Sequence, residues 1–316
     1  MVPHPKENPE FNYSFNTEKQ ALLNTKVLRN IPAKTNNKLL CATWNLTNFG
    51  LQNRSDDDIK LMAEVVSWFD LIAIQEISDS LEHLRKLLAS LPDSYDIIIS
   101  DIGGNDERAG FIYDSDKVLR LEMAAEVAVP PGDHRNIRLK GVSGAFEGFD
   151  RNPYVVAFKA GNLEFMAVSV HFYFGSNSYF NEDRRELEAY ALARWAENRH
   201  TSTGAYSNNI LIMGDMNLSK RDSQNNVYRA LKAKGLILPE HSTALMGSNL
   251  GGDCAYDQIA FHSGNMNNAY TGNSGVFDFD HTPFFNDAWN ISSDYFEQAV
   301  KYHIADHRPL WMEFNI

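Results

Sequence analysis

The chain has 316 residues, of which 43% are hydrophobic, so it can bury a large core. Its 41 acidic residues outnumber its 29 basic ones and give a net charge of −12, which excludes a global basic field that would attract nucleic acid or an anionic membrane. No apolar run is long enough to span a bilayer, and the polar, proline-rich start does not resemble a signal peptide.

Residues 1–37 lack sustained periodicity apart from a short helical pattern over 18–28, and we interpret them as an N-terminal extension. Residues 38–316 are predicted to form a single domain, because the motifs described below span most of that length. The two cysteines, Cys41 and Cys254, could pair, but two thiols in so long a chain are more typical of unpaired residues in a reducing compartment. We therefore expect a cytoplasmic protein.

Strand and helix patterns alternate from residue 38 onwards. Strands are predicted over 38–46, 71–75, 95–99, 109–113, 153–158, 163–171, 209–213, 255–261 and 310–314, and helices over 56–69, 80–88, 181–199 and 225–234. The turn between 158 and 163 indicates a hairpin, so part of the sheet structure is antiparallel. Around the strand over 255–261, the glycine- and asparagine-rich stretch 247–275 is expected to be loop. The many runs buried on both sides predict an α/β fold, a four-layer α/β/β/α sandwich of two mixed sheets.

Six of the hydrophobic runs end in a metal-binding or proton-transferring side chain. The six segments are 43–49, 74–77, 168–171, 213–217, 255–259 and 305–311. A buried strand gains nothing from a terminal carboxylate, amide or imidazole unless several strands bring theirs to one place. Together the segments supply two histidines, carboxylates that could orient them, and further groups for a metal and a phosphate. The set predicts a phosphodiesterase site.

Each of these residues also has a structural interpretation when taken alone. Glu76 could cap a strand, and Asp215 with Asn217 could belong to a turn. His171 after an apolar strand is more often a core histidine than a catalyst, and Asp306 could lie in a polar loop before the last strand. The occurrence of all of them in one chain favours the functional interpretation.

The ordered segments also carry a family resemblance. Trp-Asn-Leu-Thr-Asn-Phe-Gly, Gln-Glu-Ile-Ser-Asp-Ser, Gly-Asp-Met-Asn, Cys-Ala-Tyr-Asp and Asp-His-Arg-Pro resemble the endonuclease/exonuclease/phosphatase superfamily across residues 38–315, and within it pancreatic-type deoxyribonuclease. The resemblance implies these roles: metal ligands Glu76, Asn45 and Asp306; catalytic histidines His171 and His307, oriented by Glu107 and Asp257; Asp215 and Asn217 at the scissile phosphate or a second cation; and Arg151 on the substrate phosphate.

The implied function is Mg²⁺-dependent hydrolysis of DNA by an endonuclease like DNase I, with Mn²⁺ or Ca²⁺ substituting or assisting. The same chemistry on RNA, on a nucleotide or on a phospholipid head group such as that of sphingomyelin is the alternative. A catalytically inactive binding module of the same fold is a third hypothesis. Nucleic acid is the expected partner, and no protein partner is predicted.

Several positions depart from the deoxyribonuclease pattern. Ser78 and Thr47 stand where the resemblance leads us to expect arginines, and Asn105 stands where it leads us to expect an aromatic residue. These differences predict weak binding of duplex DNA. Lys220 stands where the cysteine that pairs with the counterpart of Cys254 would lie, so that bridge cannot form.

The helix pattern after the His171 strand, over 176–200, is expected to border the site. Arg184 and Arg185 near its start could contact substrate phosphates, or they could lie on a solvated face of the helix.

Overall fold

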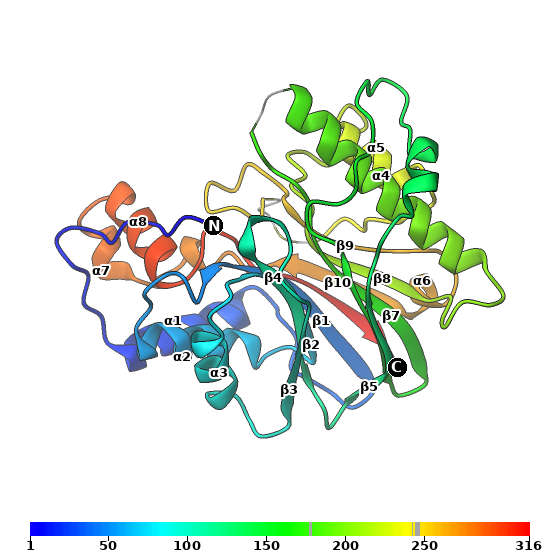
Figure 1. The fold of residues 1–316 in the computed structure, drawn as a ribbon. Coiled ribbons are helices and arrows are strands. Elements are labelled where there is room, and N and C mark those ends of the chain that lie inside the picture. The colour runs from blue at the N-terminus through cyan, green and yellow to red at the C-terminus, as the bar shows by residue number, and fades with distance from the viewer. Residues whose placement is uncertain (177–178, 242, 244–246) are drawn as a thin grey trace.

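Two mixed β-sheets lie face to face, and helices cover the outer face of each (Figure 1). The computed structural model describes the whole chain except residues 177–178, 242 and 244–246. The four-layer α/β/β/α sandwich expected from the sequence is confirmed. No helix in the described part of the chain has the length and apolar character needed to cross a bilayer.

The first sheet has six strands, of which only β1 and β2 are parallel neighbours. In spatial order they are β10 (Tyr270–Val276), β11 (Leu310–Asn315), β1 (Lys38–Phe49), β2 (Leu71–Ile77), β4 (Arg108–Asp114) and β3 (Tyr95–Ile99).

The second sheet has five strands, and again one pair of neighbours, β7 and β8, is parallel. In spatial order they are β5 (Val118–Glu126), β6 (Tyr154–Ala160), β7 (Leu163–His171), β8 (Ile210–Asp215) and β9 (Asp257–Phe261). The expected hairpin is the β6–β7 pair, with Ala160 opposite Leu163.

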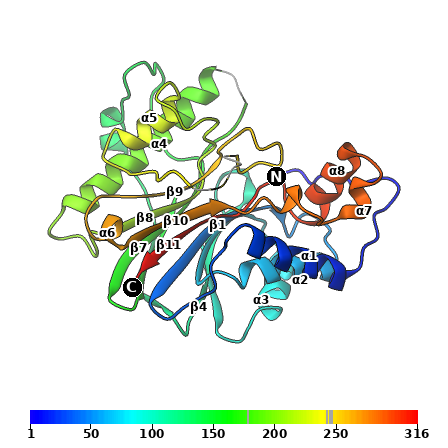
Figure 2. The same ribbon diagram turned by 180° about the vertical axis from the view of Figure 1, so that it is seen from behind.

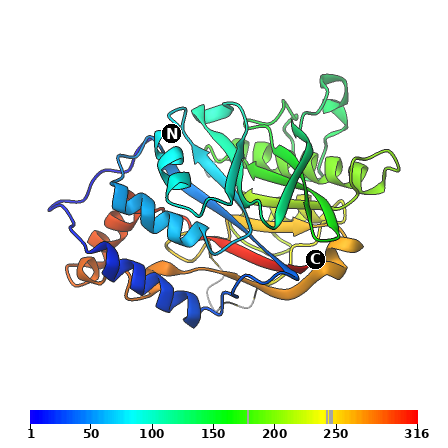
Figure 3. The ribbon, with the colours of Figure 1, turned by 90° about the horizontal axis from the view of Figure 1, so that it is seen from below.

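Helices lie outside both sheets, as the views from behind and below show (Figures 2 and 3). The first sheet is covered by α1 (Phe15–Leu28), α2 (Asp56–Val66) and α3 (Glu82–Ala89), and the second by α4 (Tyr179–Thr201) and α5 (Asn226–Lys232). The remaining helices are α6 (Asn265–Ala269), α7 (Asn286–Trp289), α8 (Ser293–His303) and the 3₁₀ turns η1 (Gly104–Asp106), η2 (Pro131–Asn136) and η3 (Phe279–His281).

Alternation along the central strands separates the core between the sheets from a core under the helices of each sheet. On β1, Leu39 and Cys41 belong to the core between the sheets, whereas Leu40 and Trp44 belong to the core under the helices. Strand β8 alternates in the same way, with Leu211 and Met213 between the sheets and Ile210 and Ile212 under α4 and α5. Every second side chain of the central strands therefore points into the space between the sheets, up to the strand ends.

The segment 1–37 packs onto the first sheet and its helices. Phe11, Leu22 and Ile31 are buried in the core under α1 and α2. Helix α1 begins at Phe15, three residues earlier than the pattern over 18–28 predicts. Cys41 and Cys254 are both free thiols.

The sequence patterns did not reveal β5, β10, α7 and α8. Strands β5 and β10 are edge strands. Most residues of β5 are at least partly exposed, so it lacks an apolar run, and β10 carries two glycines and an asparagine. The expectation that 247–275 is loop around one strand is therefore wrong, because α6 and part of β10 lie within it.

Candidate active site

The carboxyl ends of the two parallel strand pairs meet at one edge of the sandwich. There Glu76 of β2, His171 of β7 and Asp215 of β8 line a cleft of ≈ 580 Å³. The other residues that line it are Asn105, Asp150, Arg151, Tyr173, Phe174, Gly175, Asn217, Tyr256, Asp306 and His307. Seven of the ten predicted site residues thus line one cavity, while Asn45, Glu107 and Asp257 contact these residues from behind.

A bulge in β2 directs Glu76 into the cleft. Opposite β4 the register shifts between Ile74 and Ile77, opposite β1 it shifts between Asn45 and Phe49, and Glu76 has a φ of 58°. Its Oε1 accepts a hydrogen bond from Asn45 Nδ2 (2.9 Å), and its Oε2 accepts one from the Asn48 amide (2.8 Å). Glu76 lies next to the end of β2 and its side chain lines the cleft, so the choice between a strand cap and a metal ligand stays open.

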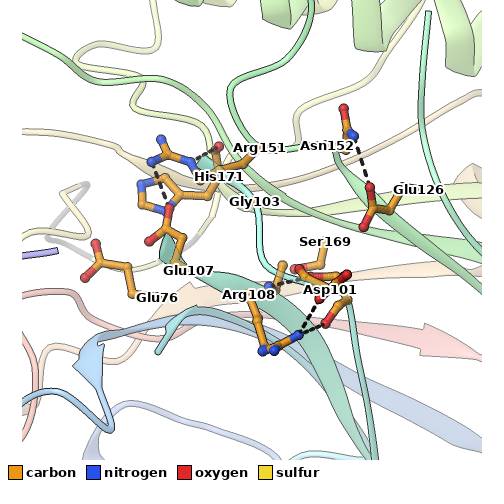
Figure 4. A pocket seen from close by; sticks show the side chains of 12 residues that line it. Glu76, Asp101, Gly103, Glu107, Arg108, Glu126, Arg151, Asn152, Ser169 and His171 are labelled. Carbon is orange, nitrogen blue, oxygen red and sulfur yellow. Dashed lines mark hydrogen bonds and ion pairs between the residues drawn. The ribbon is translucent and has the colours of Figure 1, made fainter. Parts of the chain in front are cut away.

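His171 is held by a buried carboxylate, as Figure 4 shows. Its Nδ1 lies 3.0 Å from Glu107 Oε1, and the same oxygen lies 2.8 Å from an Arg151 Nη1 nitrogen. Burial and Arg151 lower the pKa of His171, but the charges of Glu107 and Asp215 outweigh them and leave it raised. Glu107 thus lies beside Nδ1 of His171, and the orienting role that the resemblance implied stays a prediction.

His307 has a carboxylate partner of its own. Its Nδ1 lies 2.7 Å from Asp257 Oδ2, and its backbone carbonyl accepts a hydrogen bond from Trp44 Nε1 (2.9 Å). Burial lowers the pKa of His307, but the carboxylates of Asp257 and Asp215 outweigh burial and raise it well above its usual value. Asp257 thus takes the place that the resemblance implied.

Asp215 lies between the two histidines. Its Oδ2 is 3.5 Å from His171 Nε2 and 3.7 Å from His307 Nε2, and it accepts a hydrogen bond from Asn45 Nδ2 (3.2 Å). Burial raises the pKa of Asp215, but His307 and His171 outweigh burial and lower it. The carboxylate therefore stays charged between two imidazoles whose Nε2 atoms face the cleft.

Asn217 follows Asp215 in a turn with a φ of 47°. Its amide N–H donates to Asp215 Oδ1 (2.9 Å) and its Nδ2 donates to the Phe172 carbonyl (2.7 Å). The turn places Asn217 and Asp215 in the same cleft, and their role at a phosphate or a second cation stays a prediction.

Asp306 has partners for both carboxylate oxygens. Thr47 Oγ1 donates to Oδ1 (2.6 Å), and His4 Nε2 lies 3.3 Å from Oδ2. Burial raises the pKa of Asp306, but the bond from His4, the charge of His307 and the bond from Thr47 outweigh burial and lower it far below its usual range. The side chain of Asp306 is 30% exposed toward the cleft.

Unusual backbone conformations are concentrated around these residues. Of the eight non-glycine residues with positive φ in the described chain, six lie in or beside the site: Thr47, Asn48, Glu76, Asn105, Asp106 and Asn217. Each such conformation costs free energy and persists only where the surroundings impose it. These conformations lower the stability of the fold, and the surrounding structure maintains them at this cleft.

A polar layer separates the site from the core between the sheets. Thr43 Oγ1 donates to Gln75 Oε1 (3.3 Å), and Gln75 Nε2 donates to Ser169 Oγ (3.0 Å). All three side chains are fully buried. Each of them precedes a site residue on its strand: Thr43 precedes Asn45, Gln75 precedes Glu76, and Ser169 precedes His171. The three side chains therefore connect the two sheets directly beneath the site.

The donor groups suit a hard divalent cation. Glu76 and Asp306 both line the cleft, and oxygen ligands of this kind are those that Mg²⁺ binds. Glu76, Glu107 and His171 also offer ligand atoms within 4.8 Å of one another. Glu107 and His171 are paired with each other, so the predicted ligand roles of Glu76 and Asp306 stay predictions. Asn45 turns its NH₂ group to the carboxylates while its Oδ1 accepts the Thr47 amide (3.0 Å), so its role as a ligand stays a prediction.

Arg151 is engaged with the protein itself. Its Nε and Nη2 donate to the carbonyls of His171 (2.9 Å) and Phe172 (2.7 Å), while its Nη1 faces Glu107. A clamp on substrate phosphate stays a prediction. The arrangement makes Arg151 a support for the end of β7.

The arginine pair on α4, which borders the site as predicted, holds one wall of the cleft. Arg184 lies over the Tyr173 ring (4.1 Å) and bonds Asp150 (2.9 Å), and Arg185 donates to the Tyr173 and Phe174 carbonyls. Arg185 is 5% exposed, so a solvated face is wrong for this residue.

The positions that depart from the deoxyribonuclease pattern have different surroundings. Thr47 is buried and bonds Asp306, and Ser78 is buried with its hydroxyl directed to the Ser80 carbonyl (3.3 Å). Of these three residues only Asn105 lines the cleft, where it places an amide at the position at which the resemblance leads us to expect an aromatic ring.

Sequence patterns did not identify Glu188. This fully buried carboxylate accepts hydrogen bonds from the amides of Asp150 (2.9 Å) and Tyr173 (2.9 Å), and burial raises its pKa to about 7. A signal was available, since Glu188 shares a helical stripe with Leu192 and Ala196, both buried. An acidic residue on an apolar stripe indicates a buried polar contact.

No family model matches the sequence, and no curated protein does. Solved structures match over most of the chain. A mannosyl-6-phosphatase of Bacteroides thetaiotaomicron is similar at 18% identity and a TM-score of 0.55, covering 88% of this chain and 100% of that one. An endonuclease/exonuclease/phosphatase of Bacteroides vulgatus is similar at 15% identity and a TM-score of 0.55, covering 90% of this chain and 100% of that one. D. rerio TDP2 in complex with a single-stranded DNA product is similar at 15% identity and a TM-score of 0.55, covering 88% of this chain and 99% of that one. The chain therefore has the endonuclease/exonuclease/phosphatase fold.

Proposed function

We propose that this chain, which has the endonuclease/exonuclease/phosphatase fold, is a Mg²⁺-dependent phosphodiesterase that cleaves DNA as an endonuclease. The observation that carries the proposal is the pair of carboxylate-backed histidines on either side of Asp215, in one cleft with Glu76. A binding module has no use for two such buried pairs, which cost free energy to desolvate.

The histidines would move protons at Nε2. One would take a proton from water as its oxygen forms a bond to phosphorus, and the other would give a proton to the departing oxygen as the opposite P–O bond breaks. Glu107 and Asp257 bind Nδ1 of their histidines, which leaves each Nε2 available to the cleft. Asp215 would stabilise the positive charge that alternates between them.

Glu76 and Asp306 would hold Mg²⁺, with Asn45 as a third candidate ligand. When bound, the cation would stabilise the negative charge that gathers on the phosphoryl oxygens. Asn217 and the charge of Arg151 would orient the same phosphate from the opposite wall of the cleft.

The choice of DNA is supported by the site and by one neighbour. The cleft is lined by Phe174, which is 39% exposed, and by Tyr256 beside it, and exposed rings of this kind can stack on an unpaired base. TDP2 was captured with a single-stranded DNA product. We therefore expect single-stranded or flexible DNA to be cut at least as well as linear duplex. The free thiols favour a reducing compartment, so the cytoplasm remains the proposed location.

A substrate panel tests the proposal. The purified protein would be incubated with single-stranded DNA, plasmid, RNA, sphingomyelin and a sugar phosphate monoester, each with Mg²⁺ and with a chelator. We expect cleavage of DNA in Mg²⁺ only, and cleavage slower by about 10² to 10⁴ with a His307→Ala control. The name of the mannosyl-6-phosphatase indicates hydrolysis of a phosphate monoester. Hydrolysis of the monoester alone would contradict the proposed phosphodiesterase and indicate a phosphomonoesterase. No reaction on any substrate would favour a binding module.

A further inference from the structure

The first twelve residues connect the far side of the molecule to the active-site cleft. The chain start lies at the strand ends, and the segment then passes α8 and turns down to α1 (Figure 1). Two contacts anchor it at its far end: Phe11 is buried in the core under α1 and α2, and Tyr295 Oη donates to the Pro9 carbonyl (2.6 Å). Glu7, also buried, lies 3.2 Å from His303 of α8.

His4 is held in place by Gln52. The His4 amide donates to Gln52 Oε1 (2.8 Å), and Gln52 Nε2 donates back to the His4 carbonyl (3.1 Å). Gln52 is fully buried, so its amide group has a fixed position. The backbone of His4 is therefore fixed independently of where its side chain points.

The His4 side chain reaches the carboxylate of Asp306. With His4 on Oδ2 and Thr47 on Oδ1, each oxygen has one partner and keeps a further lone pair. Two partners from distant parts of the chain hold the plane of this carboxylate. Without His4, the contact with Thr47 alone would let the group rotate about its own axis.

We propose that His4 is a positioning residue of the cation site, which orients Asp306 for Mg²⁺. This inference rests on the proposed function, because it assumes that Asp306 is a ligand. Partners of this kind, which orient a metal-binding carboxylate, change metal affinity about 10- to 100-fold when they are removed. The N-terminal segment is then part of the active site and not a passive extension.

The contact has an opposite interpretation, in which His4 occupies the place of the cation and blocks it. The two interpretations differ in sign. A positioning residue strengthens Mg²⁺ binding, so its loss weakens binding. An occluding residue competes with Mg²⁺, so its loss tightens binding.

The experiment measures Mg²⁺ binding without substrate. The melting temperature would be followed against Mg²⁺ concentration for the wild type and for His4→Ala, His4→Gln, Gln52→Ala and Lys6→Ala, because a ligand that binds only the folded state raises it. Lys6 is the matched control, since it lies in the same segment and pairs with the exposed Glu10. We expect His4→Ala and Gln52→Ala to need about 10- to 100-fold more Mg²⁺. His4→Gln, which can still donate a hydrogen bond, should need less than His4→Ala, and Lys6→Ala should match the wild type.

The outcomes separate this inference from the proposed function. A wild type that Mg²⁺ does not stabilise would overturn the cation site, and the role of His4 with it. Equal Mg²⁺ requirements in the wild type and His4→Ala would overturn the role of His4 alone, and tighter binding by His4→Ala would replace it with occlusion. If Gln52→Ala does not fold, His4→Ala decides, because the His4 side chain is 28% exposed and bears little on the core.

Discussion

Two parts of the molecule set histidines against buried carboxylates, and they differ in what the second ring nitrogen contacts. His303 of α8 has Asp58 Oδ1 2.8 Å from Nδ1 and Glu7 Oε1 3.2 Å from Nε2. His307 has Asp257 2.7 Å from Nδ1, but its Nε2 is 3.7 Å from Asp215. The first ring has partners for both nitrogens at hydrogen-bond distance, and the second has one nitrogen left for the cleft.

Burial does not distinguish the two parts. His303 is 6% exposed, and His171 and His307 are 9% and 8% exposed. The difference lies in the geometry, because a ring with two close partners cannot exchange a proton with substrate. One cluster holds the N-terminal segment on α8. Under the proposed function, the other cluster would move protons.

The largest effect on turnover is expected at Glu76. We predict that Glu76→Gln abolishes cleavage in Mg²⁺, because a ligand carboxylate becomes a neutral amide of the same shape. The melting temperature without Mg²⁺ should change little, since the amide can keep one of the two hydrogen bonds of Glu76. Turnover assays at saturating Mg²⁺ measure the first effect. Turnover equal to that of the wild type would show that Glu76 is not a ligand.

The cleft histidines are expected to come next. His171→Ala and His307→Ala should each lower turnover by about 10² to 10⁴, the range for loss of a general acid or base. Because both act in one step through Asp215, the double variant should lose far less than the product of the two. Kinetics of the three variants under identical conditions test this. Losses that multiply would mean that the histidines act in separate steps.

A change in the cluster of His303, Asp58 and Glu7 should instead lower the stability of the fold. We predict that His303→Gln destabilises the fold by about 3 kcal/mol, because the buried carboxylates of Asp58 and Glu7 lose the imidazole that lies between them. Turnover at saturating Mg²⁺ should be retained. Urea unfolding and a turnover assay on the same preparation measure both quantities. A variant as stable as the wild type but with slow turnover would reverse the assignment of the two clusters.

The stabilisation by His303 should depend on pH in a defined window. Burial lowers the pKa of His303, but the bond and charge of Asp58 and the charge of Glu7 outweigh burial and raise it. This contribution is complete below the unfolded pKa of about 6.5 and is lost as pH rises through the folded pKa. Burial raises the pKa of Asp58, but its bonds from His303 and Tyr13 outweigh burial and lower it, so its contribution is present above about pH 4 and is lost in acid. The difference between the wild type and His303→Gln should therefore be largest near pH 5 to 6 and should shrink toward higher pH.

Much of the active site follows from alternation along strands. On β1, positions 39, 41, 43 and 45 point between the sheets, and they run from Leu39 through Thr43 to Asn45. The same phase on β7 and β8 brings His171 and Asp215 to the facing edge. Strands with uninterrupted apolar runs could therefore be predicted from the sequence. Together with the family resemblance, these strands predicted that the polar residues at their ends lie in one place.

The rest depends on contacts between residues far apart in the chain. Thr47 and His4 reach Asp306 across 259 and about 300 residues, and neither lies in a periodic pattern. The bulge that turns Glu76 into the cleft shows in no propensity, since φ of 58° is unfavourable for glutamate and is imposed by its surroundings. The edge strand β5 was missed because an exposed strand carries no apolar run.

The smallest effect is expected at the cleft wall. We predict that Arg184→Ala raises KM less than about fivefold and leaves kcat unchanged, because its pair with Asp150 is 34% exposed on the arginine side and such pairs contribute up to about 1 kcal/mol. Arg185 and Glu188 still hold the same wall through the Tyr173 backbone, so the wall should loosen without moving the histidines. Arg194→Ala on the same helix is the control, since its side chain bonds the Asn136 carbonyl away from the cleft. Steady-state kinetics on a single-stranded oligonucleotide would measure both constants. A fall in kcat would contradict this prediction. It would show that Arg184 affects the chemical step and not only the binding of substrate.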